Sequence, residues 1–204
     1  MKKSPQTKKL LPWENEQLTT LKKFLLFQQL PASHWPDIEL IDRGSLPKPY
    51  DFLLTQEIMT TGISQYYHRS PKIRTPIHKQ IENNIYYRAI VMVIDKVAER
   101  DNPDIADPLQ ETIAVELGLI NINLNVLPAQ IIKELDHSSI PFGSLLKNHA
   151  VKIASSNQFP FKIQSISIFQ EHLNKRDNPF FYGRTNILKD ENNRWLANVV
   201  EILA

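Results

Sequence analysis

The stretch Ile85-Tyr-Tyr-Arg-Ala-Ile-Val-Met-Val-Ile94 decides the fold class of this chain. It is rich in β-branched and aromatic residues, and it follows Asn83-Asn84, a pair that favours a turn. A second run of the same character is Trp195-Leu-Ala-Asn-Val-Val-Glu-Ile-Leu203. Both runs are too short and too interrupted to span a bilayer. Their β-branched and aromatic composition therefore predicts two strands of a sheet.

Each of these runs contains one charge among apolar side chains, Arg88 in the first and Glu201 in the second. A charged side chain is almost never fully buried without a partner, because its desolvation costs several kcal/mol. Two interpretations are open. The charges lie on an edge strand or form a structural ion pair, or they line a pocket in which Arg88 binds a substrate carboxylate. In such a pocket Glu201 accepts a hydroxyl hydrogen bond or moves a proton.

The rest of the chain carries further strand and helix patterns. An apolar run covers 112–127, and strand-like segments cover 72–78, 151–168 and 180–188. The first of these is expected to form a hairpin with the 85–94 strand. Helices are predicted at 13–30 and 52–67, and two short ones after Pro128 and Pro141. Strands joined mostly by turns and irregular loops favour an α+β domain on an antiparallel sheet. We expect one domain at 13–204 after a flexible basic tail at 1–12.

Composition bounds the function. The 204 residues are 42% hydrophobic and 23% charged, as in an ordinary globular protein, and the net charge of +2 argues against a nucleic-acid partner. Without cysteine there is no disulfide, thiolate metal site or cysteine nucleophile, which suits a cytoplasmic location. The six histidines show no metal-ligand spacing, and the five glycines form no phosphate loop. We expect no metal and no membrane insertion.

Five blocks carry a resemblance to a known family. They are Asp51-Phe-Leu-Leu-Thr-Gln-Glu-Ile-Met-Thr60, Tyr87-Arg88-Ala-Ile90, Ile140-Pro-Phe-Gly-Ser-Leu-Leu146, Phe181-Tyr-Gly-Arg-Thr185 and Glu201-Ile-Leu203. In order and approximate spacing they resemble chorismate pyruvate-lyase, also called 4-hydroxybenzoate synthase, over roughly residues 45 to 204. The length of the chain is more similar to the cyanobacterial and plastid branch.

This resemblance implies a fold, a reaction and a site. The fold is a single α+β domain in which helix-turn-helix flaps cover a ligand buried on an antiparallel sheet. The reaction converts chorismate to 4-hydroxybenzoate and pyruvate for quinone biosynthesis, such as that of plastoquinone or ubiquinone, without metal or organic cofactor. Arg88 would bind the ring carboxylate, backbone groups of Met59 and Phe142 would assist, and Glu201 would contact the ring hydroxyl. We therefore expect Arg88 and Glu201 to be the catalytic residues.

The chain departs from the family pattern at one point. Close relatives of the bacterial enzyme carry a further arginine in the middle strand, but no arginine occurs here between Arg100 and Lys133. Arg184 could bind the enolpyruvyl carboxylate instead, or it could have a structural or surface role. Glu116 could lie near the cavity, or it could point outward or form an ion pair.

A rival interpretation is a non-catalytic module of the same fold that binds a small aromatic acid, as in effector-sensing domains of bacterial transcription regulators. Such sensors are normally fused to a winged-helix DNA-binding domain, and residues 1–45 leave little room and little positive charge for one. We therefore expect the enzyme. The sequence does not predict an oligomeric state.

Overall fold

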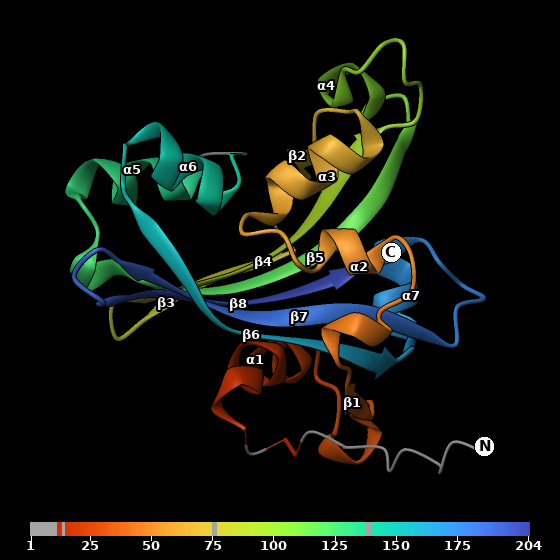
Figure 1. Cartoon of the computed structure of the whole chain (residues 1–204), viewed down its shortest axis with the longest axis horizontal. Helices are drawn as coiled ribbons and strands as arrows, with labels where there is room; N and C mark the ends of the chain where they lie inside the picture. The colour runs from red at the N-terminus through yellow and green to blue at the C-terminus, as the bar shows by residue number, and fades with distance from the viewer. Residues whose placement is uncertain (1–11, 14, 75–76, 138–139) are drawn as a thin grey trace.

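A computed structural model of the chain describes residues 12–13, 15–74, 77–137 and 140–204. Nearly all of the expected basic tail lies outside these residues. An eight-stranded sheet runs through the molecule in the order β1-β6-β7-β8-β5-β4-β2, with β3 also paired to β4 (Figure 1). Every pairing in it is antiparallel. The predicted α+β class with an antiparallel sheet is therefore confirmed.

The strands are β1 (Ile38–Leu40), β2 (Lys72–Ile73), β3 (His78–Glu82), β4 (Ile85–Asp95), β5 (Thr112–Asn123), β6 (Ile153–Gln164), β7 (Phe180–Asp190) and β8 (Trp195–Leu203). The helices are α1 (Thr19–Phe27), α2 (Tyr50–Leu53), α3 (Met59–Tyr67), α4 (Pro103–Ala106), α5 (Ala129–His137), α6 (Phe142–Asn148) and α7 (Ser167–Leu173). Short 3-10 helices lie at Glu16–Leu18, Ala32–His34, Arg43–Ser45 and Leu124–Val126. None of the helices in the described ranges has the length and apolar character needed to cross a membrane.

The hairpin predicted before β4 is present, but its first strand is β3 rather than the 72–78 segment. Asn83 and Asn84 have φ angles of 50° and 59°, which asparagine tolerates better than most residues. This two-residue turn places Glu82 opposite Ile85. The described part of the earlier segment contributes β2, which pairs with the far end of β4, and His78, the first residue of β3.

Helices cover both faces of the sheet (Figure 1). On one face, α1, which lies below the sheet in Figure 1, packs with α7 on one apolar cluster. On the opposite face, α2 and α3 cover one cluster, and α5 and α6 cover another. The core on this upper face is therefore divided, and the sheet between the two halves carries charged side chains instead of a continuous apolar layer.

Two predicted elements were wrong in extent. The helix expected at 52–67 is interrupted between α2 and α3, where Thr55 and Gln56 hydrogen-bond through their side chains to carbonyls of α2. Side-chain bonds of this kind compete with the helical ladder. The strand expected at 151–168 stops at Gln164, and α7 follows. Strand β1, which lies between Pro36 and Pro47, was not predicted from the sequence.

Candidate functional site

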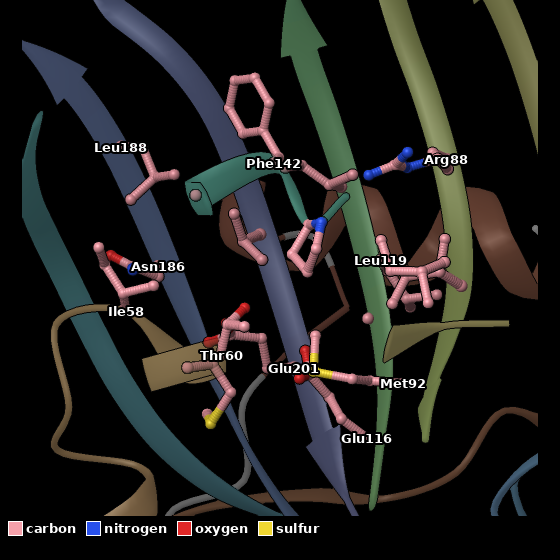
Figure 2. A pocket seen from close by; sticks show the side chains of 18 of the residues that line it. Ile58, Thr60, Arg88, Met92, Glu116, Leu119, Phe142, Asn186, Leu188 and Glu201 are labelled. Carbon is pink, nitrogen blue, oxygen red and sulfur yellow. The ribbon is translucent and has the colours of Figure 1, made fainter. Parts of the chain in front are cut away.

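A cavity lies on the upper face of the sheet, between the two halves of the divided core. Its space, counted with the open mouth, is about 630 Å³. The first residues of α3 and α6 form its cover, and β4, β5, β7 and β8 form its floor. Figure 2 shows Arg88 at one end of this cavity, and Glu201 with Glu116 at the other.

The strand register explains why these charges share a cavity. Arg88 of β4 lies opposite Ile120 of β5, and Glu201 of β8 lies opposite Gly118 of β5. Residues paired across strands point to the same face, and so do residues two apart in one strand. Arg88 and Glu201 therefore project from the same side of the sheet, separated by the width of β5. Within the described part of the chain, the ion-pair partner of Glu201 is not Arg88 but Arg184.

Arg88 is buried and has no carboxylate partner among the described residues. Its side chain lines the cavity, the residue is only 2% exposed, and its Nε has no hydrogen-bond partner among the described residues. Burial lowers the pKa of Arg88, and the charge of Tyr86 and its side-chain hydrogen bond with Arg88 act in the opposite direction. A buried guanidinium of this kind would be stabilised by a carboxylate bound in the cavity, because its planar donors match the two carboxylate oxygens.

Glu201 is held from behind by Arg184. The Nε of Arg184 donates to Oε2 of Glu201, and its Nη1 donates to the backbone carbonyls of Leu54 and Gln56. These carbonyls lie in the break between α2 and α3, so one guanidinium positions both Glu201 and the approach to α3. Arg184 is fully buried but is not part of the cavity wall. Its contact with a substrate carboxylate stays a prediction.

Glu116 points inward, which settles the orientation that its sequence context left open. It is 3% exposed, it lines the cavity, and its Oε2 has no hydrogen-bond partner within the described ranges. Burial, together with the charge of Glu201, holds the pKa of the Glu116 carboxyl well above its usual range, and Arg184 only partly opposes this shift. Two carboxyl groups therefore meet at the end of the cavity remote from Arg88.

Met59 and Phe142 occupy matching places in the cover. Each is buried, lines the cavity and is the first residue of its helix, α3 or α6. The N–H groups of a first helical turn have no intrahelical partners, and in neither helix does a capping side chain bind them. The predicted sites Arg88, Met59, Phe142 and Glu201 thus come together around one cavity. Their roles in binding and catalysis remain predictions.

Two further residues of the site, Gly118 and Asn186, were not predicted from the sequence. Gly118 lies in the floor between Arg88 and Glu201, where a side chain would meet Glu116 and Ile90. Asn186 also lines the cavity, and its Oδ1 has no partner among the described residues, while its Nδ2 donates to Ser155 at 3.3 Å. Strand alternation from Arg184 would have placed Asn186 on this face, two residues further along β7.

The described residues contain no group of three or more His, Asp or Glu side chains that could hold a metal ion. The arrangement instead offers one cation, two carboxyl groups and an apolar wall. It is suited to a small ring that carries an anion at one end and a polar group at the other.

Comparisons with known proteins find similarity only among solved structures. No model of a known family matches the chain, and no curated protein matches it. A possible transcriptional regulator, YydK from Bacillus subtilis, is 12% identical with a TM-score of 0.46, over 66% of this chain and 57% of that one. PhnF from Mycobacterium smegmatis is 7% identical with a TM-score of 0.48, over 74% of this chain and 64% of that one.

The effector domain of PhnF alone is 6% identical with a TM-score of 0.47, over 72% of this chain and 88% of that domain. The chain spans 57% and 64% of the length of the first two proteins. Similarity at this level carries no argument about substrate or activity.

Proposed function

We propose that this chain is a chorismate pyruvate-lyase, which forms 4-hydroxybenzoate and pyruvate from chorismate. The observation that carries the proposal is that the buried guanidinium of Arg88, which has no carboxylate partner among the described residues, faces the cavity from the end opposite Glu201. Strands β4 and β8 are separated by one strand, which places their backbones about 10 Å apart. A six-membered ring with its carboxylate toward Arg88 and its hydroxyl toward Glu201 suits this separation.

The five blocks of the sequence resemblance supply the reaction. Four of them contribute to the cavity wall, through Met59, Arg88, Phe142 and Glu201. The fifth contributes Arg184, which holds Glu201 in place. Blocks far apart in the sequence thus meet at one site, as a shared substrate would require.

The reaction needs few groups from the protein. A proton leaves the ring carbon that carries the hydroxyl, and its electron pair forms the new ring double bond. The bond between the adjacent ring carbon and the ether oxygen breaks, and the enolpyruvate takes up a proton to become pyruvate. Arg88 anchors the ring carboxylate, and Glu201, which is paired with Arg184, accepts the ring proton. Formation of an aromatic ring drives the step.

One observation favours a second candidate function. Arg88 is the only cationic side chain among the described residues that line the cavity, whereas chorismate carries two carboxylates. A ring with a single carboxylate, such as 4-hydroxybenzoate itself, is matched more completely. This charge balance favours a module that binds an aromatic acid and does not convert it.

The test uses the purified chain with chorismate, with pyruvate followed by a coupled dehydrogenase and 4-hydroxybenzoate by chromatography. We expect the two products in equal amounts from the wild type, and at least a hundredfold lower rates from Arg88→Met and Glu201→Gln. Tight binding of 4-hydroxybenzoate without turnover would favour the binding module. Pyruvate without 4-hydroxybenzoate would indicate a different reaction of chorismate, and neither binding nor turnover would overturn both functions.

A further inference from the structure

The Glu116 carboxyl occupies space that only a glycine leaves free. A Cβ at Gly118 would lie 3.0 Å from Oε1 of Glu116, so this carboxyl lies over Gly118. Gly118 is in turn the residue that faces Glu201 across the β5–β8 pair. The side chain of Glu116 therefore extends along the floor toward the middle of the cavity, and its carboxyl lies beside that of Glu201 (Figure 2).

The surroundings of Glu116 favour a neutral carboxyl group. No ion-pair partner of Glu116 occurs among the described residues, and the nearby cation Arg184 is already bonded to Glu201. Two carboxyl groups that share a dry site do not both ionise readily, because like charges repel and desolvation penalises each charge. The group with the arginine keeps its charge, and the group without one keeps its proton. The direction of the pKa shift at Glu116 agrees with this division.

We propose that Glu116 is a specificity-determining residue that donates a hydrogen bond to the hydroxyl oxygen of the ligand, while Glu201 accepts a hydrogen bond from the same hydroxyl. This inference rests on the proposed function, because it assumes a ring acid anchored by Arg88. A hydroxyl group is both donor and acceptor, so it satisfies one carboxylate and one carboxylic acid at the same time. The pair thus selects a neutral hydroxyl at the ring position opposite the carboxylate.

This pairing predicts which ring acids the site rejects. Benzoate lacks the hydroxyl and would leave both carboxyl groups without a ligand partner. Terephthalate replaces the hydroxyl by a second carboxylate, which would face Glu201 without a free cation. We expect each to bind at least about tenfold more weakly than 4-hydroxybenzoate.

Calorimetric titration of the full chain with these three acids tests the inference. Glu116→Leu removes the donor, and we expect it to weaken 4-hydroxybenzoate binding about tenfold while benzoate binding changes less than about threefold. Glu116→Gln keeps a neutral donor and should retain 4-hydroxybenzoate affinity within about threefold. Gly118→Ala, which displaces the carboxyl, should resemble Glu116→Leu. Glu191→Gln, at an exposed turn, is the matched control.

The outcomes separate this inference from the proposed function. Discrimination against benzoate that persists in Glu116→Leu would overturn the role of Glu116 and leave the ring-acid site intact. Equal loss in Glu116→Gln and Glu116→Leu would show that an ionised carboxylate is needed, which also overturns the inference. A wild type that binds none of the three acids would overturn the proposed function and this inference together.

Discussion

Gly183 brings the backbone of β7 so close to Glu201 that no side chain fits between them. A Cβ at Gly183 would lie 2.5 Å from the carbonyl oxygen of Glu201 and 2.7 Å from the ring of Phe161. The first of these contacts is with backbone, which cannot rotate away. The strand that carries Glu201 is therefore positioned by a glycine next to Arg184, the residue that holds the Glu201 carboxylate.

Gly183→Ala should destabilise the fold by about 1–3 kcal/mol, because the β7 and β8 backbones must shift to admit a methyl group. Urea unfolding measures the effect. Gly44→Ala is the matched control, since nothing lies within 4 Å of the added Cβ, and its change should be within about 1 kcal/mol of zero. Equal stability of the two variants would show that β7 and β8 do not pack as closely as described.

Arg184→Met should lower the free energy of unfolding by about 3–5 kcal/mol, because Glu201 would be left as a buried charge without a partner. Adding Glu201→Leu to Arg184→Met removes the unpaired charge and should restore part of the lost free energy of unfolding. Lys152→Met removes the cation of an exposed pair, Lys152–Glu191, and should change stability by less than about 1 kcal/mol. A similarly small effect of Arg184→Met would contradict the buried ion pair.

Arg88→Met is expected to act in the opposite direction. Arg88 is a buried cation without a carboxylate partner in the described part of the chain, so a methionine of similar length should raise the free energy of unfolding of the ligand-free chain by about 1 kcal/mol or more. Thermal unfolding without ligand measures this change. A loss of stability as large as that of Arg184→Met would mean that Arg88 has a structural role instead of a ligand-binding one.

Glu116 should make the stability fall as the pH rises. Its pKa is raised in the folded chain, so above the ordinary glutamate pKa the unfolded chain loses the proton first and binds fewer protons than the folded chain. The contribution of Glu116 is therefore complete below that pKa and declines as the pH rises toward the folded-state value. Because Glu116→Gln does not titrate, its stability relative to the wild type should increase between pH 4 and pH 8.

Unfolding curves of the wild type and Glu116→Gln at several pH values check this expectation. Glu191→Gln serves as the exposed control and should run parallel to the wild type. A stability difference between the wild type and Glu116→Gln that stays constant with pH would contradict the raised pKa and the neutral state of Glu116.

The features that depend on local pattern could be predicted from the sequence. The runs at 85–94 and 195–203 form β4 and β8, because alternation and composition act within a few residues. The two asparagines before β4 form the predicted turn. The sequence assigns both charges to apolar strand runs but leaves an edge-strand position open, and in the structure both are buried.

The features that depend on register and distant contacts could not be predicted. The face shared by Arg88 and Glu201 follows from how both strands pair with β5, and a slip of one residue would reverse a side chain. The Arg184–Glu201 pair depends on a register between β7 and β8 that shifts near Leu188. The break before α3 involves carbonyls that Arg184 contacts from 128 and 130 residues away.

The central claim is that the cavity between Arg88 and Glu201 holds a ring carboxylate, and calorimetric titration with 4-hydroxybenzoate tests it most directly. We predict saturable one-to-one binding by the wild type, and at least about thirtyfold weaker binding by Arg88→Met with its fold intact. Equal affinity of the two proteins, or no binding by the wild type, would contradict the claim.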